Sequence, residues 1–148
     1  MTATLEAVEL QMDDIEALDL SMIKLKLQDA EEGLGWTAEQ CDEVEVEYRR
    51  YLALKRAYPE VEIVPNKLVD AFWHAHILDT QKYATDCDAL FGCFLHHYPY
   101  FGMGGEEDYQ ALCTAFEQTR ELYDLHFGGG YGAESSRCRT QCKPVRCK

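Results

Sequence analysis

The chain has 148 residues, of which 47% are hydrophobic and 28% charged, as expected for one globular domain with a buried core. Its formal net charge is −13, but the segment from Glu134 onward holds five basic residues and one acid, so the remainder carries −17. The strongly negative charge of the residues before Glu134 argues against a nucleic-acid partner, because phosphate contacts need a basic surface. No apolar run reaches the roughly 18 residues of a membrane-spanning helix, and the acidic region after Met1 does not resemble a secretion signal. We therefore expect a cytoplasmic protein without a membrane partner.

Helical signals dominate the first half of the chain. The first dozen residues are expected to be either a frayed end or an extra helix. Asp19 is expected to cap a helix that ends at Gly33, because apolar residues recur at helical spacing between them. Thr37 and Gln40 form a capping box, and the helix that follows must end near Pro59, because proline disfavours helix in the preceding residue.

Three further helices are predicted in the second half. Pro65-Asn66 precedes the stretch LVDAFWHAHIL, and Asp79 can cap the next helix, which Gly92 ends or kinks. Three acids at 106–108 begin a last helix, where they face the positive end of its dipole. Glycines at 128–130 end that helix. The prediction is an all-α bundle of about five helices over residues 1–127, followed at 128–148 by a Gly-rich linker and a flexible, basic, Cys-rich tail.

The most distinctive residues are four histidines within a short span. Trp73-His74-Ala75-His76 lies in the third predicted helix, and His96-His97 follows about twenty residues later. Asp70 is four residues before His74, hence on the same helix face, where a carboxylate orients an imidazole. Residues two apart on a regular helix point about 200° apart, so His74 and His76 cannot both face one core. Asp70, His74, His76 and His97, with Asp86 in reserve, supply the ligand types of a zinc, iron or copper site.

Other interpretations of these residues stay open. Trp73 and His74 could pack inside with Asp70 as the hydrogen-bond partner, leaving His76 at the surface. Cys87 with His76 or His97 could form a thiolate–imidazole pair, although the sequence does not fix that geometry. The aromatic residues at 98–101 could stack a planar ligand such as haem or simply anchor a loop. Because the chain has no recognisable nucleophile–base set or cofactor loop, an enzymatic activity is left undecided.

The stretch from Glu47 to Gly102 resembles the core of the glycine-rich domain-containing protein-like family. The resemblance is carried by Val69-Asp70, Trp73-His74-Ala75-His76, Tyr83, Asp86-Cys87, Phe91-Gly92 and His97. Together with the preceding DLSMIKLKLQDAEEGLGW, which is similar to short bacterial members, it covers roughly residues 19–127. The pattern favours His97 over His96 as the inward-pointing histidine. It implies no defined biochemical activity.

Three cysteines, Cys138, Cys142 and Cys147, lie among basic residues in the last eleven positions. Neighbouring positive charge favours the thiolate form, so the tail could capture a soft metal ion. It could equally be a peptide substrate modified at its cysteines, or a poorly ordered end without a role. The function expected from the sequence is therefore metal binding by the histidine cluster and by the thiol tail. The alternative is a protein- or peptide-recognition or carrier module whose tail is the substrate of a modifying enzyme.

Overall fold

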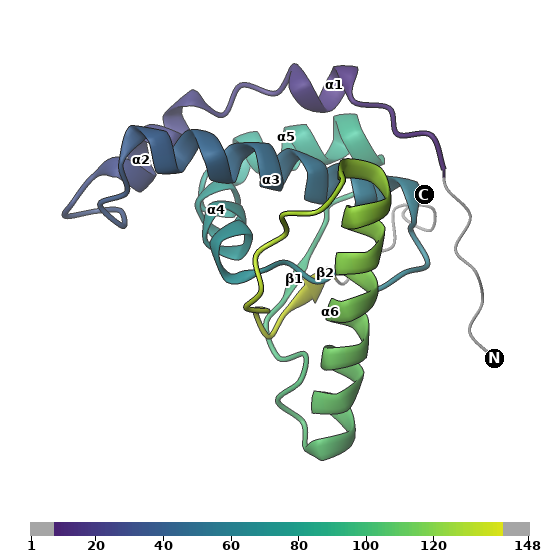
Figure 1. Cartoon of the computed structure of the whole chain (residues 1–148). Coiled ribbons are helices and arrows are strands. Elements are labelled where there is room, and N and C mark those ends of the chain that lie inside the picture. Colours follow the sequence, from purple (N-terminus) through teal and green to yellow (C-terminus); the bar gives the residue numbers. More distant parts are fainter. Residues whose placement is uncertain (1–7, 141–148) are drawn as a thin grey trace.

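The computed structural model describes residues 8–140, which form six helices and one two-stranded sheet (Figure 1). The helices are α1 (Asp13–Glu16), α2 (Ser21–Gln28), α3 (Ala38–Ala57), α4 (Lys67–Leu78), α5 (Thr80–Phe91) and α6 (Glu106–Phe127). The strands are β1 (His97–Tyr98) and β2 (Arg139–Thr140). The fold is mostly helical, which confirms the all-α prediction.

Most helix ends lie where the sequence signals placed them. The Thr37 side chain accepts a hydrogen bond from the Gln40 amide at 3.0 Å, and Asn66 caps α4 by accepting one from the Val69 amide at 2.8 Å. Gly92 and Gly128 adopt positive φ angles of 71° and 79°, which suit glycine, and end α5 and α6.

The second predicted helix is shorter than expected. α2 ends at Gln28 instead of continuing to Gly33. The reason is Asp29, whose carboxylate accepts hydrogen bonds from the amides of Glu31 and Glu32 and so stabilises a turn in place of helix. At the start of α2, the Asp19 carboxylate accepts a hydrogen bond from the Ser21 amide. The N-cap position is occupied by the next residue, Leu20.

The core is built around the contact of α3 with α4, and α4 also packs against α2 and α5. Trp73 is completely buried there, as its place on the apolar side of the helix predicts. Its indole Nε1 donates a hydrogen bond to the Tyr83 hydroxyl at 2.9 Å, so the one polar atom of the side chain is satisfied. Tyr83 in turn donates to the Leu95 carbonyl, which ties the loop after α5 to this core.

The prediction of a flexible tail beginning at 128 is wrong for residues 131–140, which we call the C-terminal strap. Tyr131 is buried, and its hydroxyl donates to the Val64 carbonyl at 2.9 Å and accepts from the Asn66 amide at 3.0 Å. The Ser136 amide donates to the Pro65 carbonyl at 3.0 Å. The strap is therefore fixed at the beginning of α4. Cys142 and Cys147 lie outside the described residues.

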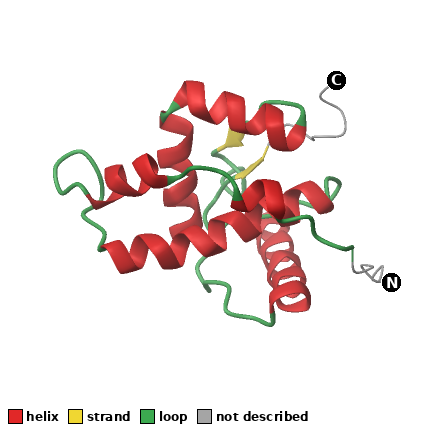
Figure 2. Cartoon of the chain, turned by 90° about the horizontal axis from the view of Figure 1, so that it is seen from above, coloured by secondary structure: helices red, strands yellow, loops and turns green. Residues whose placement is uncertain are grey.

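The strap ends in the sheet, where β2 pairs antiparallel with β1 and Thr140 lies opposite His97. Figure 1 shows the yellow end of the chain returning from α6 to β1, and Figure 2 shows how small the sheet is beside the helices. This pairing brings the strap and the segment after α5 to the same side of α4. Within residues 8–140, no helix combines the length and the apolar character needed to cross a membrane.

Candidate metal centre

Asp70 is the centre of a polar cluster on α4. Its carboxylate is one turn before His74, and the His74 Nε2 lies 3.3 Å from Asp70 Oδ1, as the i,i+4 spacing predicts. The Asp70 side chain is only 11% exposed, whereas the His74 side chain is 54% exposed. The aspartate therefore forms the floor of the cluster and His74 its solvent-facing rim.

His97 approaches the same carboxylate from the segment after α5. Its Nε2 lies 2.8 Å from Asp70 Oδ1 and 2.9 Å from His74 Nε2. The ring is held by the indole of Trp73, with centroids 4.4 Å apart. Trp73 thus has a role beyond the core, because it fixes the imidazole that faces Asp70. His96, its exposed neighbour, takes no part in the cluster.

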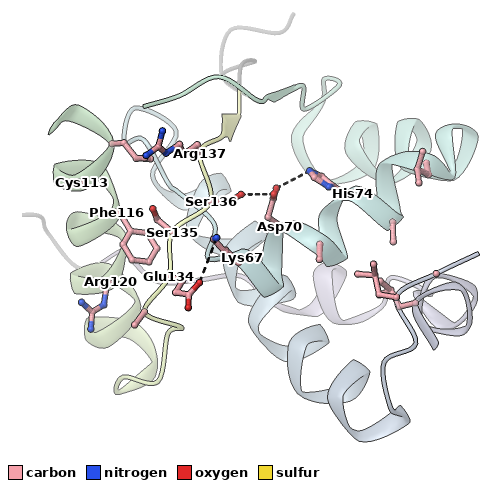
Figure 3. Close-up of a pocket in the computed structure, with 18 of the residues that line it drawn as sticks. Lys67, Asp70, His74, Cys113, Phe116, Arg120, Glu134, Ser135, Ser136 and Arg137 are labelled. Atoms are coloured by element: carbon pink, nitrogen blue, oxygen red, sulfur yellow. Dashed lines mark hydrogen bonds and ion pairs between the residues drawn. The ribbon is translucent and has the colours of Figure 1, made fainter. Parts of the chain in front are cut away.

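The strap closes the cluster from the third side. Ser136 Oγ donates to Asp70 Oδ2 at 2.6 Å, and the Cys138 thiol donates to Oδ1 at 3.2 Å. Cys138 is 2% exposed. Donor atoms of Asp70, His97 and Cys138 all lie within 4.8 Å of one another, which makes them a potential metal-ligating set. Figure 3 shows Asp70 between Ser136 on the strap and His74 on α4.

Burial and hydrogen bonding shift the pKa values of several groups in the cluster. Burial alone would raise the pKa of Asp70, but hydrogen bonds from His74, His97, Ser136 and Cys138 outweigh it and hold that pKa far below its usual range. The hydrogen bond with Asp70 raises the pKa of His74 against the opposing effect of burial. Burial, and then the charge of Asp70, raises the pKa of Cys138 strongly. Without a metal ion, Asp70 is ionised and Cys138 is a neutral thiol.

These groups have the chemistry of a transition-metal site. A carboxylate, an imidazole and a thiolate together carry two negative charges, which balance a divalent cation. Tetrahedral zinc places its ligand atoms about 2.0–2.3 Å from the ion, hence about 3.4 Å from one another. The separations of 2.8 Å and 3.2 Å from Asp70 Oδ1 to the His97 and Cys138 ligand atoms need only a small expansion to reach that value. His74 lies beside these three residues, on the open side.

His76 does not join this cluster, and its predicted place among the ligands is corrected by the structure. It is 2% exposed, its Nδ1 lies 2.7 Å from the Tyr48 hydroxyl, and its Nε2 lies 2.8 Å from Asp86 Oδ2. Both ring nitrogens are therefore already hydrogen-bonded. Burial lowers the pKa of His76 despite the opposing effect of Asp86, so the neutral ring is favoured. His76 is a core residue, and the reserve ligand Asp86 that holds it is partly exposed.

The other candidates also separate from the cluster. Burial raises the pKa of the Cys87 thiol, which is the opposite of what a nucleophilic thiolate requires. His126 lies 2.7 Å from the Tyr58 hydroxyl through its Nε2, and thus joins α6 to the end of α3. This contact is structural.

The sequence did not lead us to predict that Ser136 contacts Asp70 or that Cys138 lies in the same cluster as His97. A signal was present, because Ser136, Cys138 and Thr140 alternate with Arg137 and Arg139, which is the two-residue period of a strand. The inward residues of this pattern are the ones that reach Asp70 and β1. The basic, cysteine-rich composition of the tail obscured the pattern.

Comparison with known proteins gives one match. The model of the UCP032817-like family matches residues 15–120, a range that includes Asp70, His74 and His97 but ends before the strap. No curated protein and no solved structure matched. The similarity to glycine-rich domain-containing proteins is not tested by this match and stays a prediction. Since the match spans most of the chain, from α1 into α6, the chain belongs to the UCP032817-like family.

Proposed function

We propose that this protein binds a divalent transition metal ion through Asp70, His97 and Cys138, with His74 as an exchangeable fourth ligand. The observation that carries the proposal is the convergence of two imidazoles and one thiol, from α4, β1 and the strap, on one carboxylate oxygen of the buried Asp70. Side chains distant in sequence are brought together at a point where one ion could bind all of them.

The thiol distinguishes this proposal from a purely structural hydrogen-bond cluster. Asp70 already accepts a strong hydrogen bond from Ser136 Oγ, and a second hydroxyl at position 138 would donate better than the weak S–H group. A buried cysteine beside a carboxylate and an imidazole gains much more from a metal ion than from a hydrogen bond.

Zinc is the ion that we expect first. A mixed oxygen, nitrogen and sulfur set in tetrahedral geometry suits Zn²⁺, which has no geometric preference of its own from d-electrons. Iron(II) has the same charge and accepts the same imidazole and carboxylate ligands, and copper binds imidazole and thiolate strongly. All three ions therefore belong in the test.

The test is metal content and cobalt spectroscopy on the purified, reduced chain. We expect about one zinc per chain by elemental analysis. Cobalt substitution should give the intense charge-transfer band of a thiolate ligand. His97→Gln and Cys138→Ser should each abolish stoichiometric binding. His96→Gln changes the adjacent exposed histidine and Cys113→Ser changes an exposed cysteine, so both variants should retain it.

A protein that purifies without metal and binds none of the three ions would refute the proposal. Binding that survives in Cys138→Ser but is lost when the tail cysteines 142 and 147 are changed would place the metal outside this cluster. Loss of binding in the control variants would show that the measured ion is held elsewhere.

A further inference from the structure

A large cleft lies beside the metal centre, between α4, α6 and the strap (Figure 3). Its volume is about 1080 Å³, enough to hold a small organic molecule. Asp70, His74 and Ser136 form part of one wall, and Phe116 and Arg120 of α6 lie across from them. The cleft is thus bounded by the same strap that completes the metal centre.

The charge of the lining differs from that of the whole molecule. The chain has 14 basic and 27 acidic residues, whereas the cleft is lined by equal numbers of the two kinds. The basic ones are Lys26, Lys67, Arg120 and Arg137, and the acidic ones are Glu32, Asp70, Glu117 and Glu134. One of those acids, Asp70, is already compensated by its own hydrogen bonds. The cleft is therefore much more favourable to an anion than the rest of the surface.

Arg137 is the cation best placed to bind that anion. Its guanidinium stacks over the Tyr109 ring, 4.9 Å from the centroid, and forms no ion pair within residues 8–140. By contrast, Arg120 pairs with Glu117 at 3.3 Å. A stacked, pre-oriented guanidinium loses little freedom when it binds a carboxylate with two hydrogen bonds.

Apolar side chains supply the rest of the lining. Leu112 and Phe116 on α6 line the cleft together with two small residues of α4, Ala71 and Ala75. An apolar or aromatic group of moderate size fits such a wall, because its burial there removes hydrocarbon surface from water.

We propose that the cleft binds a small organic carboxylate with an apolar body, whose charged group is held by Arg137 and whose body lies between α4 and α6. The inference goes beyond metal binding and does not require a bound ion, because Arg137 and the apolar wall are in place without one. The guanidinium of Arg137 would bind the carboxylate of such a ligand, and the apolar lining would bind its hydrocarbon body.

The test uses 4-phenylbutyrate and its neutral analogue 4-phenylbutyramide as probes, titrated into the full chain and followed by amide chemical shifts. The carboxylate should bind about tenfold more tightly than the amide, a difference of about 1.4 kcal/mol, because only the carboxylate forms a charge-assisted contact with the guanidinium. Arg137→Gln should remove that difference. Arg139→Gln removes the same charge two residues away, on a side chain that contacts Glu62 outside the cleft, and should retain it. Ala75→Phe should block both probes.

Equal affinity for the two probes would overturn the proposal, as would carboxylate binding that is unchanged in Arg137→Gln. Shift changes confined to the exposed apolar residues of α2, Met22 and Leu25, would place the probe on another surface and also refute it. Circular dichroism of each variant establishes that a loss of binding is not a loss of fold. The metal content of the same samples is measured separately, so this proposal and the metal proposal can fail independently.

Discussion

At the scale of single residues, the two histidines of the WHxH stretch have different tasks. His74 is half exposed beside Asp70, and His76 is buried between Tyr48 and Asp86. Helix geometry predicted that the two rings point in nearly opposite directions, but not which of them is buried. The interpretation with His74 inside and His76 at the surface is wrong, because His76 is the buried ring. The pairing of Asp70 with His74 was predictable from the same helix geometry. The arrival of His97 was not, since it depends on how the chain turns after Gly92 and packs against Trp73.

The buried state of His76 gives a prediction for stability against pH. Burial holds the pKa of His76 below its ordinary value of 6.5, so the unfolded chain binds a proton more readily than the folded one. The stabilising contribution is therefore complete above pH 6.5 and is lost as the pH falls through the folded pKa. The expected slope is at most about 1.4 kcal/mol per pH unit.

The measurement is the free energy of unfolding by urea between about pH 7.5 and about pH 5.5, in the wild type and in His76→Gln. The variant should be less stable at the upper pH but lose less stability on acidification. His74 contributes with the opposite sign, because its pKa is raised, so the comparison between variants decides the matter. Parallel curves for wild type and His76→Gln would show that His76 does not titrate as proposed.

At the scale of elements, local signals predicted the helices and failed for the strap. Thr37, Asn66, Gly92 and Gly128 act through neighbours within four residues, and such signals are legible in one sequence. The strap is held by contacts with residues far away in the sequence, such as Tyr131 with Val64 and Thr140 with His97. Its basic, polar composition is typical of disorder, and tertiary contacts override that tendency.

Tyr131 is the residue that most directly tests the docking of the strap. Its hydroxyl satisfies two buried backbone groups, the Val64 carbonyl and the Asn66 amide. Tyr131→Phe leaves both without this partner and should lower the free energy of unfolding by about 1–3 kcal/mol. Tyr100→Phe, at a tyrosine that is 60% exposed, should change it by less than about 0.5 kcal/mol. Equal, small effects of the two changes in urea unfolding would restore the flexible-tail prediction.

At the scale of the whole molecule, the proposed metal centre would join the helical body to the strap. Asp70 and His97 belong to the helical body, and Cys138 belongs to the strap. An ion bound by all three would cross-link the strap to the body, in addition to the hydrogen bonds of Tyr131 and Ser136. Metal occupancy and docking of the strap are therefore expected to be coupled, because each favours the state in which the ligands are assembled.

This coupling can be measured as stability and as resistance to trypsin. Zinc at one hundred times its dissociation constant should stabilise the wild type by about 2.7 kcal/mol, because it binds the folded state. Arg137 and Arg139 are cleavage sites on the strap, and cutting requires the strap to leave the body. Zinc should therefore slow cleavage at these two positions in the wild type and in Cys113→Ser, but not in Cys138→Ser. Mass spectrometry of the digest identifies the sites. If zinc protects Cys138→Ser as well as the wild type, the ion does not join the strap to the body, and the stabilisation arises at another site.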